Sequence, residues 1–393
     1  MVTVVSPLPR LYPVVRVVAV AAIFLALAGC RHTQPTAATA PPKPSVPARL
    51  SDAELKSYHA NEAGAVMIVM YHHFDPNRPD SDLNRRPDTF RKDLEAFYKR
   101  GYRPVTLSEF LSGHMDVPGG RTPIVLTFDD SSITQFKVIT GSDGKPSIAP
   151  DCAVGIMETF HKTHPDWPTK GTFFVLPKEG RNQEPFGQAD SVADKFAYLL
   201  KNGYEIQNHT STHSSMRHMS AKQVQWELAT ALRDARAINP NAQMNILALP
   251  YGQVPGKEAR RYLISGEDGG TQYHNIAVIK AAWRPVLSPI TKNSRKITDG
   301  GSLCAFDPYN IERITPDGGK AVRVGTLEYW IKFFDEHPNL RYYSDGSPSV
   351  AAVPRAFQSW VDPQRVRKCG LTLQIYPQST SAPASEGNLS VRP

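Results

Sequence analysis

Short apolar runs and longer segments of helical periodicity alternate along most of this 393-residue chain. The apolar runs are rich in β-branched and aromatic residues, a composition typical of buried strands. They comprise residues 66–71, 103–105, 124–128, 171–176, 204–207, 245–249, 276–279 and 340–343. Between them, apolar residues recur at helical spacing, which predicts helices over residues 88–100, 151–164, 191–202, 220–238 and 326–337.

Local signals mark where several of these helices begin and end. Thr106 with Glu109, and Ser220 with Gln223, have the spacing of a capping box, so each pair predicts a helix start. Repeated strand–helix units favour a parallel sheet that closes into a barrel. We therefore predict an α/β fold, an incomplete or distorted (β/α) barrel of about seven parallel strands, with eight units as the alternative.

Residues 288–324 interrupt the alternation of strands and helices. The segment is polar and rich in turn residues, with Gly300-Gly301 and Asp307-Pro308 among them. A structureless run of this length inside a compact domain is usually functional or covers something. We expect an excursion near the open face of the barrel.

The beginning of the chain predicts export and a lipid anchor. Arg10 and Arg16 precede an apolar stretch at residues 17–27, and Ala28-Gly29-Cys30 follows. A charged start, a short apolar stretch and a small-residue cleavage site form a secretory signal. The last residues resemble the bacterial lipobox, whose cysteine becomes the lipidated first residue of the mature chain. An ordinary signal peptide with a chance cysteine is the alternative.

These patterns divide the chain into four predicted parts. Residues 1–29 are a lipoprotein signal peptide, and residues 30–49 are a tether rich in Pro, Ala and Thr. Residues 50–376 form the barrel, and residues 377–393 are a disordered tail. Lipidation would hold the barrel in the cell envelope, at the outer membrane of a Gram-negative cell and otherwise at the cell membrane.

The charge of the chain limits the kinds of partner that we expect, and the cysteine count limits the disulfides. The chain has 45 Lys and Arg against 37 Asp and Glu, a formal net charge of +8, but no basic block that would predict nucleic-acid binding. A mild positive excess suits anionic wall polymers or lipid headgroups, although scattered surface lysines give the same sum.

After Cys30, the odd count of Cys152, Cys304 and Cys369 allows at most one disulfide within a monomer. The oligomeric state is left open.

Acidic and histidine side chains follow two of the predicted strands. Asp129 and Asp130 come at the end of one apolar run, and His209 and His213 come directly after another. One carboxylate and two imidazoles are a complete ligand set for a catalytic divalent metal, which keeps one position open. The spacing of the two histidines predicts that both rings lie on one side of a helical turn. Because α/β barrels place their chemistry at the carboxyl ends of strands, we expect these groups to meet there.

With these residues in place, the chain resembles the polysaccharide deacetylase family, carbohydrate esterases with a NodB homology domain. Residues 127–130 resemble the first motif of this family, residues 209–213 its second, and residues 249–252 part of its third. Further similar segments are residues 69–73, 171–175 and 203–206, so that the resemblance covers most of residues 64–346. The resemblance implies the barrel fold predicted above.

The resemblance also implies residue roles. Asp130, His209 and His213 would bind one divalent metal ion, with zinc as the default and cobalt, nickel or manganese as alternatives. Asp129 would act as the general base on the attacking water. A backbone N–H at Tyr251 would hold the oxyanion, although this residue also fits a turn aromatic on the barrel rim. The implied reaction removes N-acetyl groups from an N-acetylhexosamine-containing envelope polysaccharide such as peptidoglycan.

The chain departs from the family in its third, fourth and fifth motifs. Ala248 stands where the family has the Arg that orients the base, and the segment around Trp283 lacks the carboxylate of the fourth motif. Gln374 stands where the fifth motif has its proton-donating His. Arg284 is a candidate replacement for the base-orienting Arg, with capping of the rim as the alternative. No catalytic role is assigned to the remaining candidates, which are His72, His73, His218 and His274.

Three functions therefore remain open from the sequence. The first is a metal-dependent deacetylase, which acts on a linear amide bond of an envelope polysaccharide. The second is a glycan-binding lipoprotein that keeps the metal cleft but has little or no turnover. The third is a hydrolase of a different acyl or amide substrate, with residues 288–324 reshaping the pocket. The fold alone does not choose among them.

Overall fold

The computed structural model describes residues 49–177, 185–294, 298, 301–318 and 322–377. The described residues all belong to one compact unit, Pro47–Pro393, and everything below concerns this unit. The predicted signal peptide, nearly all of the tether and the C-terminal tail lie outside the described residues, so these assignments stay predictions. Among the helices of the described ranges, none is both long enough and apolar enough to cross a membrane.

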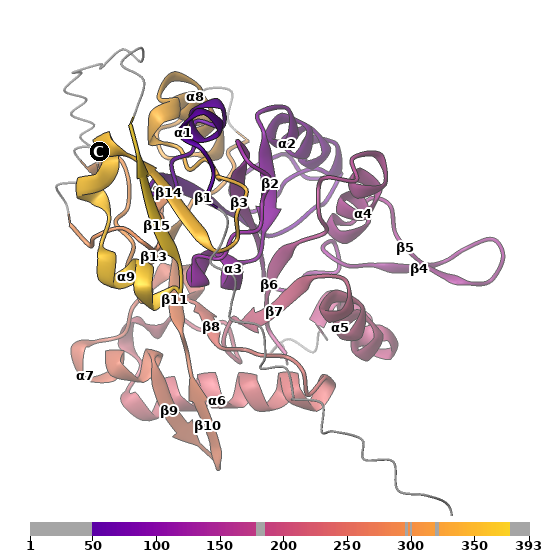
Figure 1. Cartoon of the computed structure of the whole chain (residues 1–393). Coiled ribbons are helices and arrows are strands. Elements are labelled where there is room, and N and C mark those ends of the chain that lie inside the picture. The colour runs from indigo at the N-terminus through magenta and orange to yellow at the C-terminus, as the bar shows by residue number, and fades with distance from the viewer. Residues whose placement is uncertain (1–48, 178–184, 295–297, 299–300, 319–321, 378–393) are drawn as a thin grey trace, which may run out of the picture. The chain divides into compact units, whose positions relative to one another are not determined.

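Helices and strands alternate through the second unit (Figure 1). The helices are α1 (Asp52–Ser57), α2 (Pro87–Lys99), α3 (Leu107–Ser112), α4 (Ala153–Thr163), α5 (Val192–Lys201), α6 (Ala221–Ile238), α7 (Lys257–Arg260), α8 (Leu327–Glu336) and α9 (Pro363–Lys368). The strands are β1 (Ala65–Tyr71), β2 (Tyr102–Val105), β3 (Thr122–Asp129), β4 (Val138–Thr140), β5 (Pro146–Ile148), β6 (Gly171–Val175), β7 (Tyr204–Asn208), β8 (Ile246–Ala248), β9 (Ser265–Asp268), β10 (Thr271–His274), β11 (Ala277–Ala281), β12 (Val286–Leu287), β13 (Ile311–Arg313), β14 (Val350–Pro354) and β15 (Thr372–Tyr376).

A nearly closed parallel barrel forms the centre of the fold. The strands β1, β3, β6, β7, β8, β11 and β13 follow one another in this order, and each neighbouring pair is parallel. Beyond β13, Ile314 returns to β1, because its N–H donates to the carbonyl of Ile68 and its carbonyl accepts from Met70 N, both at 2.9 Å. The prediction of an α/β barrel of about seven parallel strands is confirmed.

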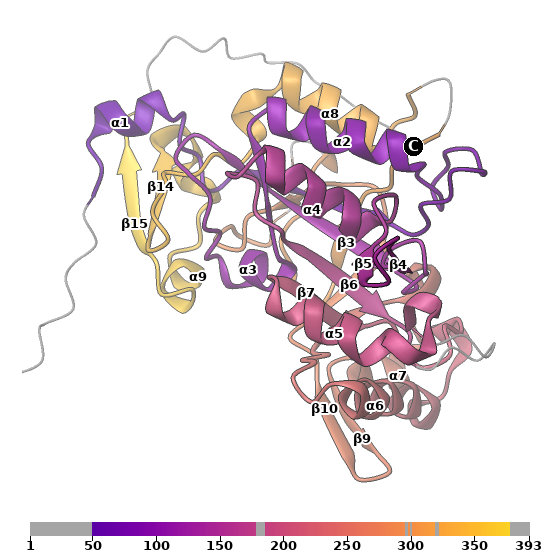
Figure 2. The same ribbon diagram turned by 90° about the vertical axis from the view of Figure 1, so that its right-hand side faces the viewer.

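Side chains alternate between the inside and the outside of the barrel, as strand geometry requires. The inward positions form one buried apolar cluster, which includes Val66, Ile68, Val125, Phe174, Ala248, Ile279 and Ile311. The outward positions, Val69 and Phe128 among them, pack in a second cluster with the helices. In Figure 2, α2, α4 and α5 cover the outer face of β3, β6 and β7. The side chain of a residue at the end of a strand therefore points either into the barrel or toward the helices, according to its place in this alternation.

Most predicted elements are present, and both predicted capping boxes are formed. Thr106 and Glu109 cap α3, while Ser220 and Gln223 cap α6. The strand predicted at residues 340–343 is wrong, since the chain there leaves a 3₁₀ turn (Pro338–Leu340) and makes only isolated bridges. Its apolar residues are instead held by packing and single backbone contacts.

The segment 288–324 is more than the predicted excursion, because it contributes β13, the last strand of the barrel. The strand is three residues long and contains Glu312 and Arg313, so it lacked the apolar run that reveals buried strands. Outside the barrel, β4 pairs with β5, β9 with β10, and β14 with β15. The cysteines Cys152, Cys304 and Cys369 are free, so none of the disulfides that the sequence allowed among them is formed.

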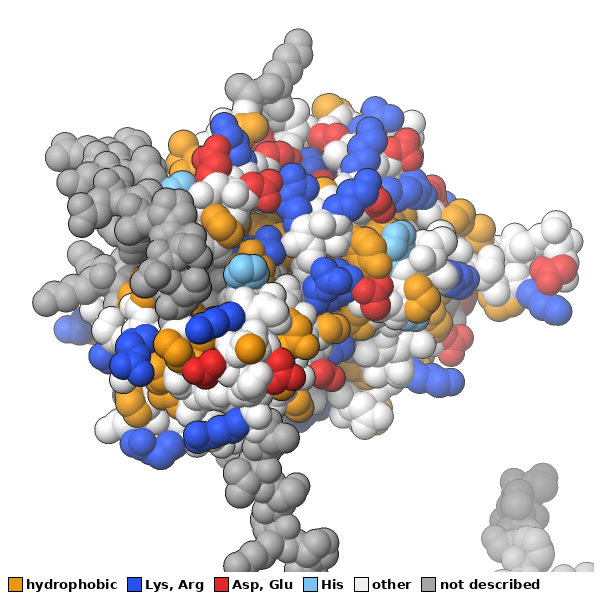
Figure 3. Space-filling model, turned by 45° about the horizontal axis from the view of Figure 1, so that its top comes forward, with side chains coloured by type: hydrophobic (Ala, Val, Ile, Leu, Met, Phe, Trp, Pro, Cys, Tyr) orange, Lys and Arg blue, Asp and Glu red, His pale blue; other side chains and the backbone are white. Residues whose placement is uncertain are grey.

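Charged side chains are mixed on the surface drawn in Figure 3. Lys and Arg side chains are interspersed there with Asp and Glu side chains rather than gathered in one field. On this face, the positive excess of the chain therefore provides no concentrated basic surface for a polyanion.

Candidate active site

The end of β3 places two consecutive carboxylates in different directions. Asp129 is the last residue of the strand, and Asp130 already has a positive φ of 76°. Such backbone conformations cost of order 1–3 kcal/mol for a non-glycine residue, so surrounding contacts must hold the turn. Gln135 supplies one such contact, because its Nε2 donates to the backbone carbonyls of Asp129 and His72. This buried amide joins the carboxyl ends of β1 and β3.

The two histidines lie in a loop after β7 rather than on a helical turn. Thr210 and His213 have positive φ angles of 72° and 55°, so the chain does not continue as a helix through His209–His213. The predicted helical turn is therefore wrong, although the predicted convergence of the rings is right. A four-residue offset also brings two side chains together when the loop between them folds back.

Glu227 of α6 holds this loop from the outside. Its Oε2 accepts the backbone N–H groups of Ser211 and Thr212, both at 2.9 Å, and its Oε1 accepts the Thr212 hydroxyl. Glu227 is only 3% exposed, so these charge-assisted hydrogen bonds form away from water. The loop that carries His209 and His213 is thus fixed to a long helix.

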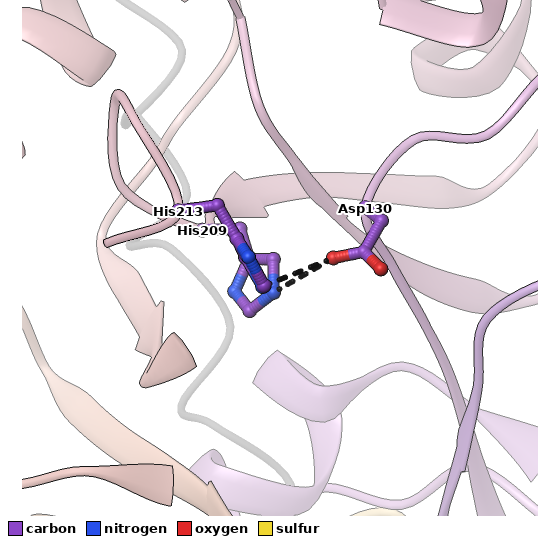
Figure 4. A group of neighbouring side chains, drawn as sticks. All are labelled: Asp130, His209 and His213. Atoms are coloured by element: carbon purple, nitrogen blue, oxygen red, sulfur yellow. Dashed lines mark ion pairs between the residues drawn. The ribbon is translucent and has the colours of Figure 1, made fainter. Parts of the chain in front are cut away.

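Asp130, His209 and His213 converge in the barrel mouth (Figure 4). Oδ1 of Asp130 lies 3.3 Å from Nε2 of His209 and 3.3 Å from Nε2 of His213. The ligand atoms of the three residues lie within 4.8 Å of one another. One carboxylate and two imidazoles at such spacing match the donor set of a catalytic site that binds a divalent metal through three protein ligands.

The polar atoms of this group also fit a metal ion. Asp130 Oδ1 and His209 Nε2 are buried, and neither makes a hydrogen bond to the described residues. His209 Nδ1 donates to the backbone carbonyl of Ala248 at 3.0 Å, which leaves the Nε2 lone pair directed to the site. Buried polar atoms without partners are costly, and a bound cation would satisfy both of them.

Electrostatics keep the carboxylate of this group ionised. Burial alone would raise the pKa of Asp130, but contact with His209 and the charge of His213 outweigh it, so the pKa lies well below its usual value. For His213, burial and the charge of His209 lower the pKa. Asp130 and His213 thus favour the protonation states in which these groups bind metals, whereas the charge of Asp129 and the contact with Asp130 outweigh burial and raise the pKa of His209.

Asp129 forms a two-point ion pair with Arg313. The two guanidinium nitrogens Nη1 and Nη2 of Arg313 donate to Oδ1 and Oδ2 of Asp129 at 2.6 and 2.7 Å. The side chains are only 1% and 2% exposed, and Nη1 also donates to the hydroxyl of Thr127 at 3.1 Å. Burial would raise the pKa of Asp129, but the charges of Arg313 and His209 lower it below its usual value. Asp129 is therefore an oriented, ionised carboxylate, with its Oδ2 3.7 Å from His209 Nε2.

Arg284 does not orient Asp129, so its proposed role as the replacement guanidinium is wrong. Its Nε and Nη2 donate to the two carboxylate oxygens of Glu312 at 2.9 and 2.6 Å. Glu312 and Arg313 are consecutive in β13, and their side chains therefore point to opposite faces of the strand. Arg284 pairs with the outward residue, whereas Arg313 reaches Asp129 from the inward position. Sequence reasoning missed Arg313 because it lies in the segment predicted as an excursion.

Tyr251 lies beside one of the histidines. It belongs to a 3₁₀ turn (Pro250–Gly252), has a positive φ of 56°, and is 65% exposed. Its ring centroid is 4.8 Å from that of His213. The predicted proximity to the metal ligands is thus present, while the role of its backbone N–H stays a prediction.

The remaining candidates separate into near and distant groups. Gln374 lies in β15, outside the barrel, where it donates to the carbonyl of Leu50, so it does not occupy the site. His274 lies in the β9–β10 hairpin, and His218 lies in a 3₁₀ turn beyond the His loop. His72 is different, because Tyr71 pairs with Phe128 and His72 therefore follows β1 at the level of Asp129. Gln135 also joins the backbone carbonyls of His72 and Asp129.

A comparison with protein families finds a match over the region that contains this site. The family model described as polysaccharide deacetylase matches residues 116–263, which contain Asp129, Asp130, His209, His213 and Tyr251. This match confirms the resemblance that the motifs predicted. Arg313 lies beyond the matched residues. No curated protein matches the sequence.

Solved structures with a similar arrangement are distant in sequence. A polysaccharide deacetylase from Bacillus cereus aligns with 68% of each chain at 15% identity and a TM-score of 0.45. The Streptococcus pyogenes deacetylase PplD in complex with acetate aligns over 68% of this chain and 97% of its own at 16% identity and a TM-score of 0.43. IcaB from Ammonifex degensii aligns over 70% of this chain and 97% of its own, at 15% identity and a TM-score of 0.41.

Proposed function

We propose that this protein is a metal-dependent hydrolase that removes N-acetyl groups from an N-acetylhexosamine-containing envelope polysaccharide such as peptidoglycan. One observation carries the proposal. Asp130, His209 and His213 form a metal-ligand set, and the ionised Asp129 is held directly beside it by Arg313. A binding site for a metal alone would not need a second buried carboxylate with its own guanidinium.

The metal would be held by Asp130, His209 and His213, with zinc as the default and cobalt, nickel or manganese as alternatives. When bound, such an ion polarises the substrate carbonyl and makes the attacking water more acidic. The contribution of Asp129 is to take a proton from that water. Arg313 fixes both carboxylate oxygens and keeps the group charged, so that Asp129 is ready to accept the proton.

His72 is our candidate for the group that delivers a proton to the leaving nitrogen. It follows β1 in the inward series that includes Val66 and Ile68, and Gln135 joins its backbone carbonyl to that of Asp129. Burial lowers the pKa of His72, so its ring is neutral at pH 7 and must take up a proton before it donates one. Its Nδ1 is buried without a hydrogen bond among the described residues, which leaves that nitrogen available.

Arg313 also provides an argument about the alternative in which the protein binds a glycan without hydrolysing it. That alternative rested on the absence of a base-orienting Arg and of a proton donor. The Asp129–Arg313 pair provides the orientation, and it does so at the cost of burying two charges, which a binding protein has no reason to retain. We therefore favour turnover over binding alone.

Acetate release from N-acetylated glycans by the metal-loaded domain tests the proposal. Asp129→Asn should abolish turnover, with a loss of at least about 10²–10⁴-fold, while metal stoichiometry stays unchanged. Glu312→Gln is the matched control, since Glu312 is also paired with an Arg but faces outward. If both variants release acetate like the unaltered protein, Asp129 is not the base.

Leaving-group dependence separates the roles of His72 and Asp129. His72→Ala should lower the hydrolysis of acetamides more than that of acetate esters, because an alkoxide or phenolate leaves with less help from an acid. Asp129→Asn should lower both. If amides and esters are equally inert with metal bound to the unaltered protein, the hydrolase proposal fails and the glycan-binding reading replaces it.

We further propose that Cys30 is lipidated and that residues 30–49 tether the barrel to a membrane of the cell envelope. The support is the sequence alone, since Ala28-Gly29-Cys30 follows the apolar stretch. Mass spectrometry of the mature N-terminus should find a lipid on Cys30, and Cys30→Ser should release the protein to the soluble envelope fraction. An unmodified Cys30 in a soluble protein would refute the anchor.

A further inference from the structure

A surface cleft of about 390 Å³ adjoins the loop that carries the metal ligands. One wall comes from the segment after His213, with Ser214, Ser215 and His218, and the other from α6, with Gln223, Trp226 and Glu227. The volume falls in the range of about 300–1,000 Å³ that is common for small-ligand pockets. The metal site and this cleft therefore share one stretch of chain.

Trp226 is the unusual member of the lining. It lies on α6 but off the buried face, which includes Val224, Leu228 and Leu232, and its side chain is 42% exposed. None of the aromatic pairs among the described residues includes Trp226. Ring packing in the core therefore does not account for an indole in a cleft. An exposed tryptophan that lines a cleft offers a flat apolar face on which a ligand can stack.

The position of the cleft is fixed relative to the metal ligands. Glu227, which lies next to Trp226 in the chain and lines the cleft, holds the backbone N–H groups of Ser211 and Thr212. Ser214 lines the cleft and directly follows the ligand His213. The lining of the cleft therefore begins at the residue after a metal ligand, which makes the cleft a candidate place for the neighbouring unit of a polymer whose reacting unit sits at the metal site.

The polar groups of the cleft favour an uncharged sugar. Hydroxyl, imidazole and amide groups of Ser214, His218 and Gln223 can exchange hydrogen bonds with sugar hydroxyl and acetamido groups. Among the described residues that line the cleft there is no Lys or Arg, and Glu227 contributes a carboxylate. A polymer rich in phosphate or carboxylate would lack a counter-charge here.

We infer that this cleft is a sugar subsite, in which Trp226 stacks on the pyranose ring next to the N-acetylhexosamine that is deacetylated. The inference rests on the proposed function, since it takes the polymer that the metal site would act on as the ligand. It makes Trp226 a residue that binds extended substrates and takes no part in the reaction itself.

Kinetics with N-acetylglucosamine oligomers of one to five units test the inference. Trp226→Ala should raise KM for the longer oligomers about 3- to 10-fold and leave kcat unchanged, which corresponds to one lost aromatic contact. Hydrolysis of p-nitrophenyl acetate should be unaffected, because this ester is too small to reach the cleft. Trp226→Phe should recover most of the lost affinity. An unchanged KM for every oligomer in Trp226→Ala would overturn the subsite.

Tyr309→Ala is the matched control for loss of an exposed ring. Tyr309 is 41% exposed but precedes β13, so it lies toward the opposite end of the barrel strands from the metal ligands. Its removal should change KM for no oligomer. An effect equal to that of Trp226→Ala would show a general surface effect and would contradict the inference.

Binding measurements on a variant that lacks the proposed base distinguish the subsite proposal from the hydrolase proposal. Calorimetry measures binding of the N-acetylglucosamine pentamer to Asp129→Asn and to the double variant that also carries Trp226→Ala. Turnover does not interfere, because neither protein has the base. Trp226-dependent binding, together with no acetate release by the metal-loaded unaltered protein, would support the subsite and refute the hydrolase. Acetate release by the unaltered protein, together with binding that does not depend on Trp226, would refute the subsite and leave the hydrolase standing. Absence of pentamer binding in both proteins would overturn the subsite.

Discussion

Two buried carboxylates near opposite ends of the barrel behave in opposite ways. Asp129 ends β3 and is 2% exposed, whereas Glu62 precedes β1 and is 4% exposed. Burial raises the pKa of both groups, but Arg313 brings the pKa of Asp129 below its usual value. Glu62 lies beside Asp345 instead, whose charge raises its pKa further. The neighbouring charge, rather than burial, therefore decides which carboxylate is ionised.

This difference assigns different tasks to the two ends of the barrel. At the carboxyl end, an ionised and oriented carboxylate lies beside the candidate metal ligands, as the proton transfer proposed for it requires. At the amino end, Glu62, whose pKa is raised well above its usual value, accepts a hydrogen bond from the backbone N–H of Asp345 at 3.2 Å and contributes to the structure. The separation agrees with the general placement of chemistry and stability in α/β barrels.

Removal of Arg313 should have the largest effect on stability. Arg313→Ala leaves Asp129 buried without its guanidinium, and breaking a buried ion pair in this way typically costs about 3–5 kcal/mol in the free energy of unfolding. Turnover should fall as well, because Asp129 loses its orientation. Urea unfolding and acetate release measure the two effects.

Arg284→Ala provides the matched comparison for Arg313→Ala. Arg284 is partly exposed, and after its removal Glu312 keeps Lys280, whose Nζ lies 3.8 Å from Oε1. The expected loss is smaller than for Arg313→Ala, because Glu312, although only 4% exposed, keeps this second cation. Equal losses in the two variants would mean that burial inside the barrel does not distinguish the two pairs.

The second-largest expected effect on stability is that of a metal bound at the carboxyl end of the barrel. At a free metal concentration of about 100 times Kd, the free energy of unfolding should rise by about 2.7 kcal/mol. His213→Ala should remove this response, while His218→Ala, which changes a nearby histidine outside the ligand set, should keep it. Thermal unfolding with and without zinc provides the measurement. A similar response in both variants would exclude His213 as a ligand.

The sequence was sufficient for those parts of the site that stand directly after strong strands. Asp129 and Asp130 end the apolar run of β3, and His209 and His213 follow β7, so strand periodicity alone places them at one end of the barrel. The helical turn predicted for the histidines failed because spacing does not distinguish a helix from a loop. The loop depends on Glu227, a contact from a later helix.

The pairing of Arg313 with Asp129 could not be predicted from the sequence, because it too depends on a contact between distant elements. Its hydrogen bonds to Asp129 join residues 184 positions apart, and they depend on which face of a three-residue strand the side chain occupies. Glu312 and Arg313 are both charged residues, so polarity does not distinguish them in the sequence. Only the pairing of β11 with β13 fixes which of them points inward. Ala248, where the guanidinium was expected, instead contributes its backbone carbonyl to His209.

The smallest predicted effect is a dependence of stability on pH at the amino end. Burial raises the pKa of Asp345 to about 6, and burial with the charge of Asp345 raises that of Glu62 above its usual value. The folded state therefore binds these protons more tightly than the unfolded chain, whose carboxyls titrate at about pH 4. The stabilisation is fully present below about pH 4 and is lost as the pH rises through about 6 and above. Urea unfolding from pH 4 to pH 8 should show this fall.

Glu62→Gln should flatten this pH profile, because the amide keeps an oxygen for the N–H of Asp345 but cannot lose a proton. The variant should therefore gain stability relative to the unaltered protein as the pH rises, and differ least near pH 4. Glu258→Gln, on the exposed surface of α7, is the control for the loss of one carboxylate. A parallel profile for Glu62→Gln and the unaltered protein would mean that Glu62 is ionised in the folded state. The contrast between Glu62 and Asp129 would then rest on orientation by Arg313 alone.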